Sequence, residues 1–158
     1  MRLSEILTSH RILVAPSGEA PCNGDAVLRS LAELLARGGP CNAQGVYEQL
    51  AAREKLQSTG IGEGVAIPHT SLGEVEGQRA ALVLCPGGID FDSIDREPVT
   101  IFFAVIGPKS AAGAHLKILA KISRLLRSPE TRRRLLESTG PMQAYSLIEE
   151  HDAASIES

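Results

Sequence analysis

The chain has 158 residues, of which 43% are hydrophobic and 22% charged, a balance typical of one folded domain rather than of a disordered segment. A net charge of −3 argues against nucleic acid as a partner, and an aromatic content of 3% without tryptophan argues against a stacking platform for single strands. No apolar run approaches the roughly 20 residues that span a bilayer. The N-terminus is also too charged for a signal peptide, so we expect a cytoplasmic protein without membrane insertion.

Apolar spacing and capping residues predict an alternation of helices and strands. Asn23 or Asp25 can cap a helix that stops at Gly38-Gly39-Pro40, and Ser128-Pro129-Glu130 combines a cap with a proline at the first helical position. The apolar run VTIFFAVI, residues 99–106, indicates a central strand covered on both faces. In chain order we expect a helical turn at 3–7, a strand at 11–15, helices from about 23 and at 42–55, strands at 65–67, 80–84 and 99–106, and helices at 112–127, from 128 and at 142–150.

The stretch REKLQSTGIGEGVAIPHT, residues 53–70, ends a helical pattern and leads to His69 directly behind a proline. Pro68 fixes its own φ and restricts Ile67 to extended geometry, so the backbone that presents His69 is stiff. Glycines in the loop leave room for an approaching group or for unusual φ angles, and they are Gly60, Gly62 and Gly64. A histidine held in this way can be a nucleophile, a proton shuttle or a metal ligand.

A second histidine, His115, falls in the first turn of the helix after the predicted central strand. If the sheet brings its strand ends together, His69 and His115 flank one pocket beside a helix N-terminus, where an anion such as phosphate is favoured. Arg53 can reach an anion there with its planar guanidinium, and the hydroxyls of Ser58 and Thr59 can donate to it. From spacing alone, the alternative of ordinary loop, helix and surface residues remains open.

A cation site is the competing interpretation of the same residues. Asp90, Asp92 and Asp95 follow one strand, but they lack the EF-hand pattern, and a turn between strands explains them better. A metal-dependent hydrolase using His69, His115 and an aspartate such as Asp92 is therefore the alternative function, and it is weakened because no two ligands share local metal-site spacing. The three cysteines show no CxxC spacing, which favours reduced thiols.

The order of REKL, STGIG, IPH and HLKILAK resembles the active-site signature of the phosphotransferase system IIA domain of the fructose/mannitol type, a group that includes nitrogen-regulatory IIA proteins. The resemblance continues through FDSIDREPVTIFFAVIGP and covers nearly the whole chain. It implies an α/β fold with a single domain over residues 1–150, in which helices flank a small mixed β-sheet on both faces. We expect residues 151–158 to form a frayed C-terminal tail.

The resemblance also implies roles for individual residues. His69 matches the phosphorylated histidine, His115 the second histidine of the pocket, and Arg53 the arginine near the phosphorylation site. The position after the active histidine is usually glycine in this family, whereas Thr70 stands there in this chain. We expect the phosphate to be held by these residues together with Ser58, Thr59, Gly60, Gly62 and Thr70.

The expected function is that of a phosphocarrier, which takes a phosphoryl group on His69 from an HPr-type phosphocarrier protein. It then passes the group to a IIB domain or controls a regulatory target protein by its phosphorylation state. The absence of a fused IIB or membrane segment favours the nitrogen-regulatory version. No cofactor and no metal are expected, because transfer between two nitrogens depends on positioning and charge stabilisation. An apolar surface near His69, with Ile61, Val65 and Ile67 as candidates, would receive the carrier unless these side chains belong to the core.

Overall fold

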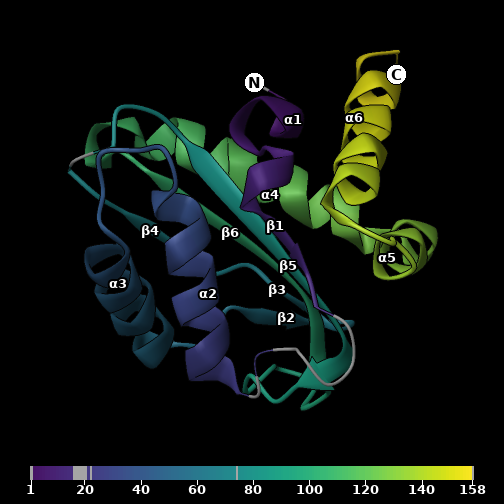
Figure 1. Cartoon of the computed structure of the whole chain (residues 1–158), viewed down its shortest axis with the longest axis horizontal. Helices are drawn as coiled ribbons and strands as arrows, with labels where there is room; N and C mark the ends of the chain where they lie inside the picture. Colours follow the sequence, from purple (N-terminus) through teal and green to yellow (C-terminus); the bar gives the residue numbers. More distant parts are fainter. Residues whose placement is uncertain (1, 16–20, 22, 74, 158) are drawn as a thin grey trace.

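The computed structural model describes residues 2–15, 21, 23–73 and 75–157. Within them, six strands form one mixed sheet. Five follow the order β1–β5–β6–β3–β2, and β4 pairs with β6 farther along the edge that β3 also occupies. Figure 1 shows this sheet between two groups of helices. The strands are β1 (Ile12–Val14), β2 (Gly60–Gly62), β3 (Val65–Ala66), β4 (His69–Ser71), β5 (Arg79–Ile89) and β6 (Val99–Gly107).

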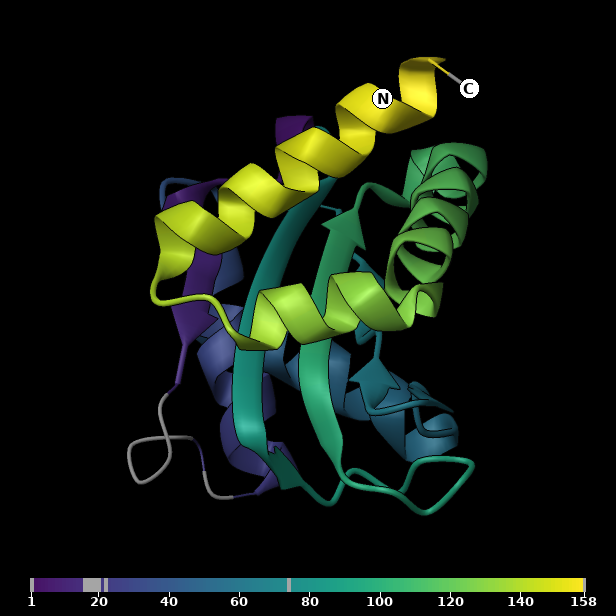
Figure 2. The same cartoon turned by 90° about the vertical axis from the view of Figure 1, so that its right-hand side faces the viewer.

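Helices cover both faces of the sheet, and Figure 2 shows the three C-terminal ones lying across the face opposite α2 and α3. Short 3-10 turns at Ser9–Arg11 and Lys109–Ala111 precede β1 and α4. The α-helices are α1 (Leu3–Ile6), α2 (Gly24–Ala36), α3 (Ala43–Leu56), α4 (Ala112–Arg127), α5 (Pro129–Leu136) and α6 (Pro141–Glu157). In the described residues, no helix is both long and apolar enough to cross a membrane.

Strand alternation divides the core into two layers. On β6, Phe102, Ala104 and Ile106 pack with residues of α2 and α3, whereas Ile101, Phe103 and Val105 pack with residues of α1, α4, α5 and α6. Successive side chains of a strand point to opposite faces, so one buried strand serves both layers. The continuous apolar run therefore forms the central strand that the sequence predicts, and helices flank the sheet on both faces as expected.

The neighbour of β6 on one side is interrupted. Val65 pairs with Ile101 and His69 with Val105, both in parallel register, so β3 and β4 follow one another along the same edge of β6. Pro68 lies between them and has no N–H to donate, although its carbonyl accepts from the Val105 N–H at 3.0 Å. The missing donor explains why the structure has two short strands where one longer strand would fit.

Several predicted boundaries are confirmed, and others differ. The side chains of Asn23, Asn42 and Ser128 cap α2, α3 and α5, and α4 has the predicted bounds. The predicted strand at 80–84 extends to Ile89, and β2 and β4 were not predicted, because three-residue strands with glycine or polar residues carry no apolar period.

The expected tail from residue 151 is instead part of a helix, since α6 continues to Glu157. The helix continues because it contacts the other end of the chain. The buried carboxylate of Asp152 accepts hydrogen bonds from the backbone N–H groups of Leu3 at 3.2 Å and Ser4 at 2.8 Å. Because α1 has no side-chain cap of its own, Asp152 supplies the missing acceptor.

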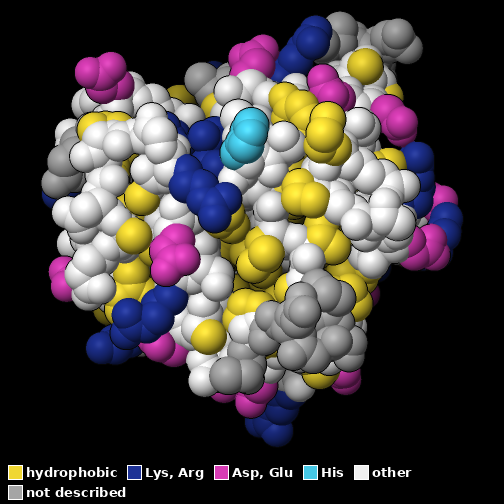
Figure 3. All heavy atoms as spheres, in the orientation of Figure 1, with side chains coloured by type: hydrophobic (Ala, Val, Ile, Leu, Met, Phe, Trp, Pro, Cys, Tyr) yellow, Lys and Arg dark blue, Asp and Glu magenta, His cyan; other side chains and the backbone are white. Residues whose placement is uncertain are grey.

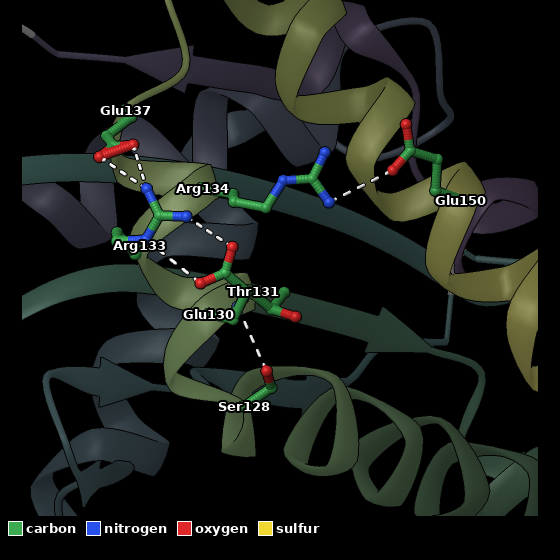
Figure 4. Close-up of polar contacts among 7 residues, drawn as sticks. All are labelled: Ser128, Glu130, Thr131, Arg133, Arg134, Glu137 and Glu150. Atoms are coloured by element: carbon green, nitrogen blue, oxygen red, sulfur yellow. Dashed lines mark hydrogen bonds and ion pairs between the residues drawn. The ribbon is translucent and has the colours of Figure 1, made fainter.

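Charged side chains hold α5 in place on the surface (Figure 4). Arg133 bridges Glu130 and Glu137 within its own segment, and Arg134 reaches Glu150 of α6 at 3.4 Å. These pairs are exposed, so each contributes little alone, and of the three the Arg134–Glu150 pair is the one that joins α5 to α6. Arg133 and Arg134 are therefore solvated, whereas the Arg132 side chain is only 16% exposed and donates to the carbonyls of Leu126 and Arg127.

Acidic and basic side chains are interspersed on the face that carries α2 and α3 (Figure 3). Apolar side chains lie between them, and no patch of one charge sign dominates this view.

Replacing Asp152 with alanine should lower the free energy of unfolding by about 1–3 kcal/mol, because two N–H groups of α1 lose their acceptor. Urea denaturation measures the difference. The control is Glu149→Ala, an exposed position on the same helix, which should leave stability nearly unchanged. Equal effects of the two variants would contradict the capping role of Asp152.

Candidate functional site

His69 begins β4, and its side chain lies on the face of the sheet that α4 covers. It pairs with Val105, which belongs to the core layer beneath α4, and residues paired across neighbouring strands point to the same face. The ring nitrogen Nδ1 lies 2.7 Å from the carbonyl oxygen of Ile67. A carbonyl only accepts, so Nδ1 carries the proton and Nε2 is left with its lone pair.

His115 lies in the first turn of α4 and is buried, with 8% of its surface exposed. Its Nδ1 lies 2.9 Å from the amide oxygen Oε1 of Gln78. An amide oxygen also accepts, so this ring has the same proton arrangement as His69, with Nε2 unprotonated in the neutral form. The buried position reflects the spacing of α4, where Ile118 and Ile122 continue the inward face.

The two imidazoles are neighbours, as the sequence predicts. Their ring centroids are 5.7 Å apart, and the planes are tilted by 52°. Burial first, and the charge of His69 second, lower the pKa of His115 below its ordinary value. His115 is thus kept neutral beside His69, and its Nε2 can take up a proton when negative charge arrives at the pair.

Arg53 lies in the last turn of α3, on the other face of the sheet. Its guanidinium donates to the carbonyl oxygen of Gln57 at 3.0 Å and so caps its own helix. Helix α3, whose last turn carries Arg53, packs against β4, the strand that begins with His69. Among the described residues, no hydrogen bond joins Arg53 to either histidine.

Ser58 and Thr59 run beside the His69 segment, since the Ile67 N–H donates to the Thr59 carbonyl at 3.1 Å. Both hydroxyls already have partners. Ser58 Oγ donates to the carbonyl of Phe91, and the hydroxyl and N–H of buried Thr59 both donate to the carboxylate of Glu54. These bonds hold the loop in shape, and the phosphate-binding role of the two hydroxyls stays a prediction.

The glycine loop lies farther from His69 than its sequence position suggests. Gly62 has a φ of 95° at the end of β2, and it pairs with Val65. Val65 and His69 are four residues apart along β6, which is about 13 Å at the rise of a strand. Gly60 pairs with Ala66, closer to His69, and a side chain there would collide with Ser93. The structure therefore does not bring Gly62 to the histidine pair.

Thr70 faces away from the two histidines. It pairs with Ile106, whose side chain belongs to the layer beneath α2 and α3. Its φ is not among the positive values of the described residues, so the backbone at position 70 does not require glycine. A β-branched residue fits a strand well, and Thr70 leaves the His69 side of the sheet unchanged.

The candidate residues for a carrier contact separate into two kinds. Val65 and Ile67 are buried in the core, whereas the Ile61 side chain is 52% exposed on β2. For a metal, the described residues contain no group of three His, Cys, Asp or Glu side chains that could hold an ion. The hydrolase alternative with His69, His115 and Asp92 therefore finds no support.

Two residues of this site were missed by sequence reasoning. Gln78 contacts His115, and Ser71 lies two residues after His69, on the same face of β4. Neither belongs to a motif, and only their places at strand ends beside the two histidines could have marked them.

Comparisons with known proteins identify the family of the chain. The family model described as "Phosphoenolpyruvate-dependent sugar phosphotransferase system, EIIA 2" matches residues 8–151. The chain therefore belongs to this family of IIA proteins, as its motifs indicate.

Individual relatives narrow the comparison. A nitrogen regulatory protein of Pseudomonas aeruginosa is 37% identical over 150 residues, which cover 94% of this chain and 95% of the relative. The crystal structure of the nitrogen regulatory protein IIA-Ntr from Neisseria meningitidis has a TM-score of 0.83 and 30% identity, covering 92% of this chain and 98% of that chain. The complex of enzyme IIAMTL and phosphorylated enzyme IIBMTL from Escherichia coli shares the fold, with a TM-score of 0.74, 18% identity and coverage of 90% and 96%.

The pKa of His115 should lie below 6.5 in an NMR pH titration of the folded protein, and His69→Ala should raise it because a neighbouring charge is removed while burial remains. The unfolded chain binds this proton more readily, so the His115 contribution lowers stability as pH falls below about 6.5 and levels off below the folded pKa. Titration in concentrated urea gives the unfolded reference. A folded value at or above that reference would contradict the effect of burial.

Proposed function

We propose that this protein is a phosphocarrier that accepts a phosphoryl group on Nε2 of His69 from the phosphohistidine of an HPr-type carrier protein. The observation that carries the proposal is the hydrogen bond from His69 Nδ1 to the Ile67 carbonyl, which leaves Nε2 unprotonated. A nucleophile needs this lone pair, and the bond holds the ring in one orientation. Membership of the IIA family supplies the reaction class.

The transfer exchanges one nitrogen–phosphorus bond for another. The lone pair of His69 Nε2 forms the new bond, and the donor nitrogen regains its lone pair as the old bond breaks. No proton has to leave His69, because Nδ1–H stays on the Ile67 carbonyl throughout. Catalysis then consists of alignment and of stabilising negative charge on the phosphoryl oxygens.

His115 and the N-terminus of α4 are the proposed partners of those oxygens. The α4 N-cap residue, Ala111, makes no side-chain capping bond, and the first N–H groups of a helix have no partners within it. They favour an anion, and the neutral His115 gains a proton on Nε2 when the phosphoryl charge arrives, which makes it a donor. Arg53 adds a permanent positive charge from the α3 side of the strand.

Two roles are compatible with phosphoryl acceptance on His69. It can pass the group to a IIB domain, as the IIAMTL–IIBMTL complex illustrates for its own proteins, or it can act on a regulatory target according to its phosphorylation state. We favour the regulatory role, because the nitrogen regulatory protein of Pseudomonas aeruginosa is 37% identical over 94% of this chain, whereas the fructose-specific EIIA component of Haloferax volcanii is 27% identical over 95% of it. Both roles place the protein in the cytoplasm.

Incubation with a phosphorylated HPr-type carrier should add one phosphoryl group to the protein, seen as a mass shift that acid removes. His69→Ala should abolish the shift, because the acceptor nitrogen is gone. The matched control is His10→Ala, an exposed histidine outside the site, which should be labelled like the wild type. Labelling of His69→Ala would sink the assignment, and subsequent transfer to an added IIB domain would favour the sugar-transport role.

Arg53→Gln should slow phosphoryl acceptance by roughly 10²-fold, because one positive charge near the transferring group is removed. Single-turnover kinetics with the phosphorylated carrier measure the rate. Lys55→Gln, an exposed cation in the same turn of α3, is the control and should change the rate little. If both variants slow transfer equally, Arg53 acts only through the general charge of the helix end.

A further inference from the structure

A row of three residues crosses the sheet next to the histidine pair. Arg79 pairs with Ile106 in antiparallel register, so Gln78 stands opposite Gly107, and Gly107 pairs with Ser71 of β4. Arg79 donates to the Leu35 carbonyl on the α2 side, which places the preceding side chain, that of Gln78, on the α4 side with His115.

Gly107 makes room for Gln78. A Cβ atom at Gly107 would lie 2.2 Å from Nε2 and 2.4 Å from Oε1 of Gln78, closer than any real contact. The absence of a side chain therefore lets the amide lie across the end of β6 and reach the first turn of α4. With 8% of its surface exposed, Gln78 is held by this fit.

Only one of the two polar atoms of the Gln78 amide has a hydrogen-bond partner among the described residues. Its Oε1 accepts from Nδ1 of His115 at 2.9 Å, whereas its buried Nε2 makes no hydrogen bond with the described residues. A buried donor without a partner costs free energy, so the glutamine is a poor choice for stability alone. What it achieves is the orientation of His115, since the proton on Nδ1 fixes the tautomer and turns Nε2 to the other side of the ring.

We propose that Gln78 is a positioning residue, which holds His115 in the Nδ1–H tautomer so that its Nε2 is available to the phosphoryl group on His69. This role rests on the proposed function, although the tautomer itself exists in the unphosphorylated protein. Gln78 touches neither phosphorus nor donor, and it acts only through His115. An amide suits the task because its oxygen accepts the Nδ1 proton whether His115 is neutral or charged.

Gln78→Met tests the role, because methionine has a similar shape but offers no comparable acceptor. Long-range ¹H–¹⁵N spectra of the unphosphorylated protein should show His115 with a protonated Nδ1 in the wild type and a mixture of tautomers in Gln78→Met. Gln78→Glu restores an acceptor oxygen and should restore the Nδ1–H form. Gly107→Ala should act like Gln78→Met, because its methyl group displaces the amide.

Phosphoryl acceptance by Gln78→Met should fall roughly 10- to 100-fold, the loss seen when a residue that orients a functional histidine is removed. Its urea midpoint should be unchanged or higher, because an unpartnered buried amide is removed. Gln44→Met, at an exposed position of α3, is the control and should alter neither the tautomer nor the rate.

Three results would overturn the proposal: a wild-type His115 protonated on Nε2, an unchanged tautomer in Gln78→Met, or a slower rate explained by a lower urea midpoint with the tautomer intact. If instead the wild-type protein accepts no phosphoryl group, the proposed function fails. The spectra would still decide whether Gln78 sets the tautomer of His115.

Discussion

The backbone of β6 is the constraint on which the rest of the structure depends. All residues from Ile101 to Ile106 are inaccessible to solvent, so every N–H and C=O of this strand has to be satisfied by neighbouring strands. Strand β5 does so on one side, and the pieces β3 and β4 do so on the other. A slip by one residue would exchange the two apolar faces, which ties the register of β4 to the packing of the whole core.

The register of β4 and β5 against β6 also sets which side chains point toward the candidate site. It directs His69 toward α4 and Thr70 toward α3. At the start of β5, Arg79 points toward α2, and Gln78, the residue before the strand, points toward α4. The two histidines lie side by side, and each donates a hydrogen bond from Nδ1: His69 to the Ile67 carbonyl and His115 to the Gln78 side-chain oxygen. Each ring in its neutral form thus keeps an unprotonated Nε2, and the proposed phosphoryl transfer rests on this arrangement.

The sequence predicts the parts of the fold that depend on neighbours along the chain. The capping side chains of Asn23 and Ser128, the helix start near Asn42 and the bounds of α4 are such local features, and they agree with the structure. The end of α6 does not, because Asp152 finds its partners 148 and 149 residues away, at the N-terminus. No local pattern contains such a contact.

In the candidate site, too, the sequence predicts some residues and misses those that depend on contacts between distant parts of the chain. The pairing of His69 with His115 is expected from a strand end and a helix start, and the family signature marks both residues. Gly62 is close to His69 along the chain, but its strand partner Val65 pairs with β6 four residues before His69 does, a separation that the sequence does not show. Gln78 is invisible in the sequence, since its role needs the empty side-chain position at Gly107 on another strand.

The break at Pro68 also affects how the sheet ends. Strand β4 has three residues and, within the described residues, pairs only with β6, so it is an exposed edge beside the histidine site. A long regular edge would invite pairing with the strand of another molecule. Because Pro68 has no N–H and because β3 and β4 are both short, a strand of another molecule finds no continuous edge to pair with. His69 can therefore lie at a sheet edge without inviting edge-to-edge aggregation.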